Sequence, residues 1–144
     1  RIKLISDGDV AGSLQTAMPE SGVDILMGIG GTPEGVITAA AMRCLGGEIQ
    51  GKLWPRDDAE REKAQSQCDL DKVLTTEILC GGENVFFAAT GITSGELLEG
   101  VHYAGHIART FSLVMRSRSG TVRYIESRHR LDRLQTFSQV TYVD

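Results

Sequence analysis

Short apolar stretches alternate with more polar segments along residues 1–90. Residues 2–5 alternate and predict a strand. Residues 23–27 form a nearly continuous apolar run, as expected for a strand buried on both faces. A helical pattern follows each of these strands, over residues 10–18 and 33–45. This strand–helix rhythm is typical of an α/β domain.

The rest of the chain predicts shorter elements and then a succession of strands. We expect strands at 48–54 and 84–90, helices at 59–67, 78–80 and 96–98, and finally strands at 100–105, 108–117 and 120–128. A short polar connection ending at Gly120 joins the last two strands, which predicts an antiparallel hairpin. This pattern of elements therefore predicts a single α/β domain with a mixed sheet.

One glycine-rich stretch, Met27-Gly-Ile-Gly-Gly-Thr-Pro-Glu-Gly-Val36, lies between the second predicted strand and its helix. Thr32 is suited to cap this helix, Pro33 to its first position, and Glu34 then lies in the first turn. The helix is expected to end at Gly46-Gly47. Backbone N–H groups at such a helix start can bind an anion, and a carboxylate placed there can also hold a cation.

This glycine-rich stretch matches neither of the common nucleotide-binding loops. No Lys-Ser or Lys-Thr pair follows the glycines, as a Walker loop requires, and Pro33-Glu34 interrupts the spacing of a dinucleotide-binding fingerprint. Two interpretations stay open at this point. The stretch is either a ligand-binding loop or a glycine-rich turn that leads into a well-capped helix.

A second acidic motif, Asp7-Gly8-Asp9, follows the first predicted strand. The carboxyl ends of strands are where α/β sheets bind ligands, and two carboxylates there can accept hydrogen bonds from sugar hydroxyls or contribute to a metal site. The alternative is a turn in which Asp9 only caps the next helix. Because both motifs end neighbouring strand–helix units, we expect them to open on one rim.

Composition narrows the class of protein. The 144 residues carry a net charge of −4, which gives no nucleic-acid-binding footprint, and no apolar run approaches the roughly 20 residues of a membrane span. Cys44, Cys68 and Cys80 form no C-x-x-C motif and favour a reduced, cytoplasmic compartment. No signal peptide precedes the first strand, and the chain begins inside a strand pattern without Met, so we expect a piece of a longer protein.

Basic residues gather near the predicted hairpin, at Arg116, Arg118, Arg123, Arg128 and Arg130. They suit phosphate capture or a subunit contact, or alternatively a solvated edge strand protected by charge. If the strand continues, Arg116 and Arg118 share a face. The histidines, which lack metal-ligand spacing with any Cys or acid, are expected at the surface or in the core: His102, His106 and His129.

Several segments, in the same order, resemble the class II (GlpX-type) fructose-1,6-bisphosphatases. They are Lys3-Leu-Ile-Ser-Asp-Gly-Asp9, Met27-Gly-Ile-Gly-Gly-Thr-Pro-Glu-Gly35, Arg43-Cys-Leu-Gly-Gly47, Phe87-Ala-Ala-Thr-Gly91, Ser112-Leu-Val-Met-Arg-Ser117 and Thr121-Val-Arg-Tyr-Ile-Glu126. The similarity runs from near Arg1 to about Leu134. Any one segment alone is weak, but the ordered set is specific.

The resemblance implies a cytoplasmic, Mn²⁺- or Mg²⁺-dependent sugar-bisphosphatase of gluconeogenesis and a homo-oligomer. Its fold would be a layered α/β sandwich similar to inositol monophosphatases, of which this chain is the second half. The resemblance makes Glu34 a metal ligand, and it places Asp7, Gly8, Asp9 and Gly31 against the substrate.

Two local departures, at Arg109–Ser112 and Thr93–Gly95, touch none of the site residues carried over from the family. The larger departure is the absence of an N-terminal half that carries the family's other metal carboxylates. Since Mg²⁺ and Mn²⁺ want about six oxygen ligands, we expect the isolated chain to be inactive. The competing hypotheses are a non-catalytic sugar-phosphate-binding module and an oligomerisation module.

Overall fold

The computed structural model describes residues 1–136. Helices α1–α5 span Asp9–Gln15, Thr32–Leu45, Asp58–Gln65, Thr76–Leu79 and Leu131–Leu134, and the 3-10 helices η1 and η2 span Pro19–Ser21 and Ser117–Ser119. Strands β1–β6 span Gln50–Gly51, Leu74–Thr75, Phe86–Thr90, His102–Ala104, Ile107–Arg116 and Thr121–Arg130. Among residues 1–136, no helix combines the length and hydropathy that crossing a membrane requires.

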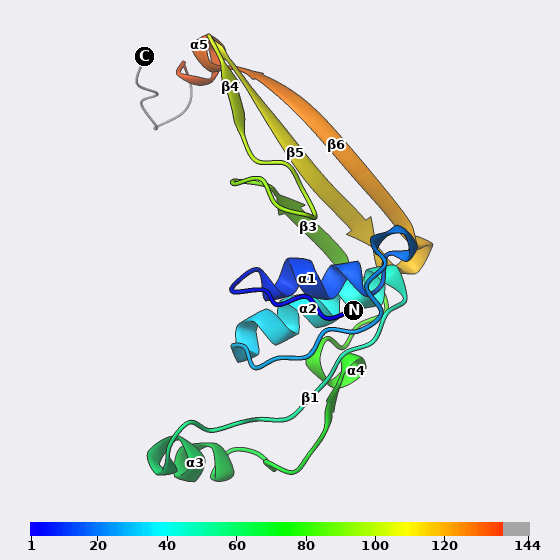
Figure 1. The fold of residues 1–144 in the computed structure, drawn as a ribbon, viewed down its shortest axis with the longest axis vertical. Helices are drawn as coiled ribbons and strands as arrows, with labels where there is room; N and C mark the ends of the chain where they lie inside the picture. The colour runs from blue at the N-terminus through cyan, green and yellow to red at the C-terminus, as the bar shows by residue number, and fades with distance from the viewer. Residues whose placement is uncertain (137–144) are drawn as a thin grey trace.

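The molecule has a helical centre with one extension at each end (Figure 1). Helices α1 and α2 lie side by side at the centre, and the sheet β3–β6 extends from them in one direction. In the other direction, the β1–β2 ladder leads to α3, which lies at the far end. The elongated outline leaves much of the helical centre without a covering layer on its left-hand side in Figure 1.

The larger sheet is built around β5. Strand β6 pairs with β5 along its whole length, from Ile107↔Arg130 to Arg116↔Thr121, while β3 and β4 share the opposite edge. The predicted hairpin is therefore confirmed. Within residues 1–136 every strand pair is antiparallel, so the α/β class holds but the expectation of a mixed sheet is wrong for this part of the chain.

Several predicted elements do not form. Residues 2–5 and 23–27 are not strands, because in the described part of the chain no neighbouring strand pairs with their backbone. The expected strand 48–54 shortens to β1. Residues 96–98 form no helix; the loop there folds back on itself, with the Gly100 N–H donating to Ser94 Oγ at 3.0 Å.

The predicted bounds of α2 hold closely. Gly31 is its N-cap residue, and Thr32 is its first helical residue rather than the cap. At the other end, Gly46 takes a left-handed conformation, φ 76°, and donates its N–H to the Met42 carbonyl at 2.8 Å. A residue with a Cβ is disfavoured in that conformation, so Gly46 ends the helix as predicted.

The core lies where α1 and α2 meet the near end of the sheet. Leu14 from α1 and Cys44 from α2 pack with Phe87, Leu113 and Met115 from β3 and β5. Leu113 and Met115 are fully buried. Burial raises the pKa of the Cys44 thiol, with a smaller contribution from the nearby Cys80. The core fixes α2 on the sheet and therefore fixes where its amino-terminal end lies.

Candidate functional site

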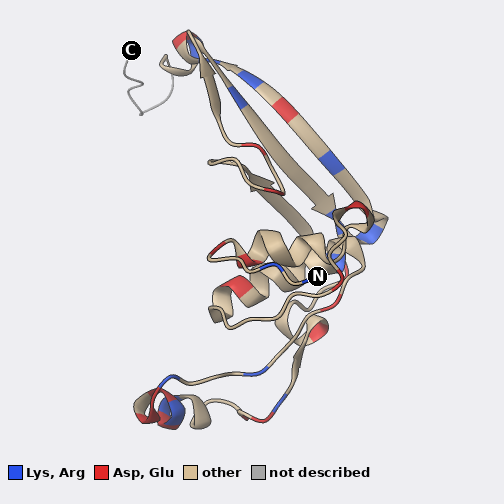
Figure 2. Ribbon diagram, in the orientation of Figure 1, with Lys and Arg blue, Asp and Glu red and all other residues tan. Residues whose placement is uncertain are grey.

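The amino-terminal ends of α1 and α2 open into one hollow with a volume of about 1000 Å³. Asp7, Asp9, Gly30, Gly31 and Glu34 all line it. Figure 2 shows acidic segments at the first turns of these two helices, which lie side by side. The structure therefore brings the two motifs predicted from the sequence to one rim, as expected.

Asp9 is held at this rim by the start of α1. Gly8 precedes it in a left-handed conformation, φ 73°, which a residue with a Cβ rarely adopts. One carboxylate oxygen, Asp9 Oδ1, accepts the Val10 N–H at 2.9 Å, and the Asp9 carbonyl accepts the Ser13 hydroxyl at 2.7 Å. Asp9 is thus the first residue of α1 rather than its predicted cap. Its other carboxylate oxygen remains directed to the glycine loop.

The glycine pair at residues 30 and 31 touches two carboxylates from different elements. A Cβ added to Gly30 would lie 2.7 Å from Asp9 Oδ2. A Cβ added to Gly31 would overlap Glu34 Oε2. The carboxylates of Asp9 and Glu34 therefore occupy space that is free only because Gly30 and Gly31 lack side chains. Both carboxylates lie against the same glycine pair.

The carboxylates of this rim are not neutralised by a basic partner. Within residues 1–136, no ion pair involves Asp7, Asp9 or Glu34. All three are exposed, and Asp9 and Glu34 lie in the first turns of helices, where the helix dipole favours negative charge. The rim therefore presents unpaired negative charge to a ligand in the hollow, which suits a divalent cation or sugar hydroxyls.

The donor chemistry fits Mg²⁺ or Mn²⁺, which prefer carboxylate oxygens. The number of donors is smaller than such an ion needs. Residues 1–136 contain no group of three His, Cys, Asp or Glu side chains close enough together to hold a metal ion. Because Mg²⁺ takes about six oxygen ligands, further ligands would have to come from outside this part of the chain, from water or from a substrate.

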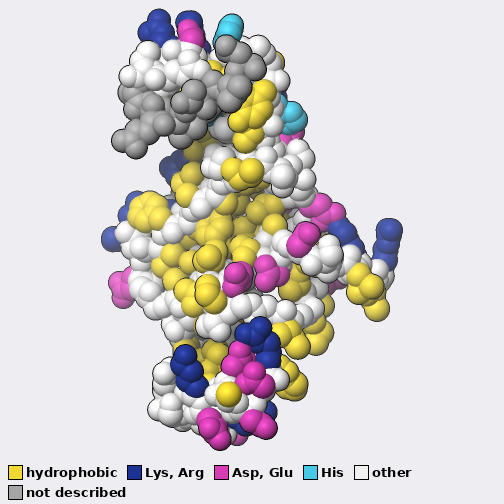
Figure 3. All heavy atoms as spheres, turned by 90° about the vertical axis from the view of Figure 1, so that its left-hand side faces the viewer, with side chains coloured by type: hydrophobic (Ala, Val, Ile, Leu, Met, Phe, Trp, Pro, Cys, Tyr) yellow, Lys and Arg dark blue, Asp and Glu magenta, His cyan; other side chains and the backbone are white. Residues whose placement is uncertain are grey.

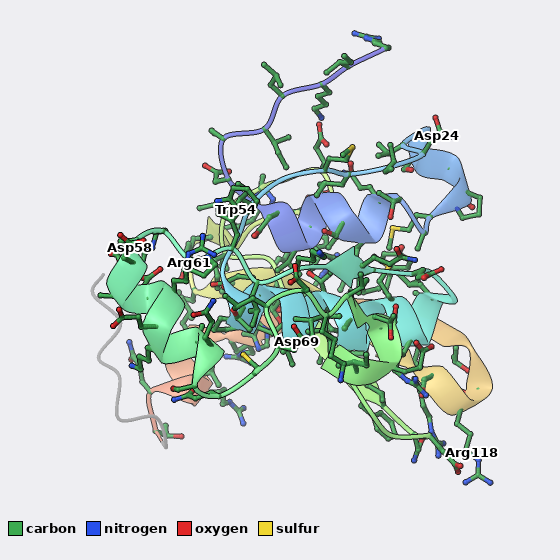
Figure 4. All side chains as sticks on the ribbon, turned by 90° about the horizontal axis from the view of Figure 1, so that it is seen from below. Asp24, Trp54, Asp58, Arg61, Asp69 and Arg118 are labelled. Atoms are coloured by element: carbon green, nitrogen blue, oxygen red, sulfur yellow. The ribbon has the colours of Figure 1, made fainter. Side chains whose placement is uncertain are left out.

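The opposite wall of the hollow was not predicted. Lys52 and Trp54 line it from the segment that joins β1 to α3, and Lys63 lines it from α3 itself. Figure 4 labels Trp54. Lys52 Nζ lies 3.5 Å from Asp71 Oδ1, and the Trp54 ring is largely exposed. No local pattern signals this wall, because the β1–β2 ladder brings it to the hollow through pairing distant in sequence.

The arginines of the hairpin mostly have neighbours within the sheet. Strand β5 ends at Arg116 and Arg118 lies in η2, so the strand does not continue and the condition under which these two would share a face is not met. The Arg116 side chain donates to Asn84 Oδ1 at 2.8 Å and stacks over Phe86. Arg128 lies 3.6 Å from the Glu126 carboxylate. None of these arginines lines the hollow.

Two of the three histidines also have identified neighbours. His102 Nε2 lies 3.2 Å from Glu99 Oε2, and its ring meets the Phe111 ring edge-on. His129 Nε2 hydrogen-bonds with Thr110 Oγ1 at 2.9 Å. These contacts occur on the sheet, away from the hollow, and agree with structural rather than ligand-binding roles.

Comparison with known proteins matches residues 1–129 to the family described as bacterial fructose-1,6-bisphosphatase, glpX-encoded. Fructose-1,6-bisphosphatase 1 class 2 of Escherichia coli strain K12 is 44% identical over 154 aligned residues, covering 97% of this chain and 46% of the relative. Fructose-1,6-bisphosphatase class 2 of Shigella flexneri matches with the same identity and coverage. The chain thus spans about half the length of the curated relatives it matches. On this evidence the chain belongs to the class II, glpX-encoded fructose-1,6-bisphosphatase family.

Proposed function

We propose that this chain supplies part of the active site of a metal-dependent fructose-1,6-bisphosphatase. The complete enzyme would hydrolyse the 1-phosphate of fructose 1,6-bisphosphate to fructose 6-phosphate and inorganic phosphate, a cytoplasmic step of gluconeogenesis. The observation that carries the proposal is the meeting of the Asp9 and Glu34 carboxylates at the glycine pair 30–31. Family membership adds the reaction class.

Each motif takes one role in this proposal. Glu34 is a ligand to Mn²⁺ or Mg²⁺, and the ion, when bound, polarises the phosphoryl group and activates water. Asp7 and Asp9 accept hydrogen bonds from sugar hydroxyls across the rim. The absence of side chains at Gly8 and Gly31 lets the substrate approach the backbone, where the first N–H groups of α2 favour an anion.

The site is completed by the rest of the enzyme, which we call the complementary part: the portion of the Escherichia coli relative that this chain does not match. From the family resemblance we infer that it is the N-terminal half of the enzyme, which would supply the remaining carboxylates. The isolated chain is therefore expected to be inactive, since the described residues gather no three-ligand metal group. The complete enzyme is expected to be a homo-oligomer.

Mixing this chain with the complementary part tests the proposal directly. We expect Mn²⁺-dependent phosphate release from fructose 1,6-bisphosphate by the mixture and none by either part alone. Glu34→Gln should lower the rate at least about tenfold, because losing a metal ligand costs no less than losing a residue that supports one. Glu20→Gln, an exposed carboxylate of η1 outside the hollow, is the matched control. An active mixture unaffected by Glu34→Gln would contradict the assignment.

The alternative functions make different predictions. A non-catalytic sugar-phosphate-binding module would bind fructose 1,6-bisphosphate without metal and without the complementary part, which calorimetry on the isolated chain detects. An oligomerisation module acting through the hairpin arginines would self-associate, and Arg118→Ala with Arg123→Ala would weaken that association. The unpaired charge at the rim favours the phosphatase over both.

A further inference from the structure

Large apolar side chains are exposed on two extended segments beside the hollow. Leu4 is 92% exposed and Met27 is 86% exposed, and Ile2, Ile25 and Ile29 are also largely in solvent. We call these five residues the bare apolar surface. The face of the molecule shown in Figure 3 carries a broad hydrophobic region bordered by acidic side chains. Monomeric proteins rarely leave large apolar patches exposed to solvent, so we expect a partner to cover this surface.

The same two segments already cover α1 with their other side. A Cβ added to Gly12 would lie 2.8 Å from Leu26 Cδ1 and 3.0 Å from Ile5 Cδ1. Leu26 and Ile5 therefore pack on α1, while their neighbours Ile25, Met27 and Leu4 point outward. Apolar residues on both sides of an extended segment are typical of a strand in the middle of a layered structure. Here only one of the two sides is covered.

Within residues 1–136, the backbone of residues 2–5 and 25–29 also lacks hydrogen-bond partners in other segments. Figure 4 shows the chain before α1 running outside the helices as an extended segment. Extended backbone with free N–H and C=O groups can pair with added strands, which supply main-chain hydrogen bonds as well as side-chain contacts.

The accessible area of the whole chain also exceeds that expected of a compact monomer. A compact monomer of 15.6 kDa is expected to expose about 7,300 Å², whereas this chain exposes 10682 Å². Residues 137–144, even if fully extended, would contribute only about 1,400 Å² of the difference. About 2,000 Å² of excess therefore remains over the whole elongated molecule, which is large enough to include the roughly 800 Å² that one partner contributes to a standard stable interface.

We propose that residues 2–5 and 25–29 pair as strands with the complementary part of the enzyme, and that the bare apolar surface is buried by it. This inference rests on the proposed function for the identity of the partner. Met27 and Ile29 also line the hollow that contains Asp9 and Glu34. A partner seated on them therefore lies beside the incomplete carboxylate rim, where it can add the ligands that the rim lacks.

A second copy of this chain is the competing occupant, and two observations favour the complementary part. It makes up more than half of the relatives' length, so its size suits the uncovered area. The bare apolar surface adjoins the hollow, whereas a second copy seated there would bring another rim of like charge, Asp7, Asp9 and Glu34, towards the first.

The test splits the Escherichia coli relative at the boundary of the match. Its own matching segment is the positive control for association with the complementary part, measured by co-elution. This chain should also co-elute, and backbone amides of residues 2–5 and 25–29 should change from fast to slow hydrogen exchange in the complex. Met27→Asp should weaken association about a hundredfold or more, since it buries an unpaired charge.

Tyr103→Asp is the matched control, because Tyr103 on β4 is similarly large and 68% exposed but lies outside the bare apolar surface. Three results would each overturn the proposal. They are association that survives Met27→Asp, fast hydrogen exchange of these amides in the complex, and failure of this chain to bind where the control segment binds. Self-association of the chain alone that Met27→Asp abolishes would assign the surface to a second copy instead. A complex with protected amides but no phosphatase activity would support the docking and contradict the proposed function.

Discussion

Asp9 and Gly30 are in contact although they lie on different segments: a Cβ on residue 30 would lie 2.7 Å from Asp9 Oδ2. The contact joins the start of α1 to the loop that leads into α2. It exists because residue 30 has no side chain, and it sets how far the Asp9 carboxylate can approach the loop. The geometry of the proposed substrate site therefore depends on a glycine that binds nothing through a side chain of its own.

Gly30→Ala should displace the Asp9 carboxylate while leaving the fold intact, because the contacted atom is the end of a flexible side chain. We expect an increased KM for fructose 1,6-bisphosphate in the assembled enzyme with little change in the unfolding midpoint. Steady-state kinetics and circular dichroism measure the two quantities. Gly95→Ala is the control, because a Cβ there has no heavy atom within 4 Å and residue 95 does not line the hollow. Equal effects of the two substitutions would refute the role given to the Asp9–Gly30 contact.

Leu113→Ala should destabilise the isolated chain by about 2–5 kcal/mol, the usual cost of a large-to-small change at a fully buried site. Leu113 lies in the cluster that fixes α2 on the sheet. Urea unfolding followed by circular dichroism gives the free energy. Leu4→Ala removes the same atoms from a side chain that is 92% exposed and should change stability little. If the two variants lost similar stability, the assigned core would be wrong.

Stability should fall at acidic pH through Glu96. Hydrogen bonds from Lys3, and secondly from Gln15, hold the pKa of the Glu96 carboxyl below its ordinary value. Because the pKa of Glu96 is lowered in the folded state, the stabilisation of the fold by its charged carboxylate is present at pH values above the ordinary glutamate pKa. It is lost as the pH falls through the folded-state pKa. The effect should be small, because the group is exposed to solvent.

Glu96→Gln should therefore reduce the difference in unfolding free energy between neutral pH and a pH below the glutamate range. Glu83→Gln is the control, since no ion pair involves Glu83 in the described chain. An unchanged pH dependence in Glu96→Gln would show that the contact between Lys3 and Glu96 contributes nothing in solution.

Local signals in the sequence predicted some elements well. Gly46 stops α2 because its backbone takes a left-handed conformation, and the polar connection before Gly120 joins two strands with high β propensity. The rim was also predictable, because Asp9 and Glu34 each lie in the first turn of a helix that follows an apolar stretch. These features depend on a few adjacent residues, which is the range over which sequence patterns are informative.

Other features depend on contacts that the sequence does not encode locally. Residues 23–27 have a strand pattern but no strand beside them in the described chain. Lys52 and Trp54 reach the hollow only through the ladder of β1 with β2. The residue pattern indicated a mixed sheet for a related reason. Whether two strands run parallel is decided by which strands pair, and strand propensity does not report that.

The central claim is that Glu34 binds the catalytic cation, and Mn²⁺ binding to the assembled enzyme tests it most directly. Electron paramagnetic resonance measures the free and bound Mn²⁺ without relying on turnover. The account predicts that Glu34→Gln weakens Mn²⁺ binding by at least about tenfold, while Glu20→Gln leaves it unchanged. Equal Mn²⁺ affinity in the wild-type enzyme and the Glu34→Gln variant would contradict it.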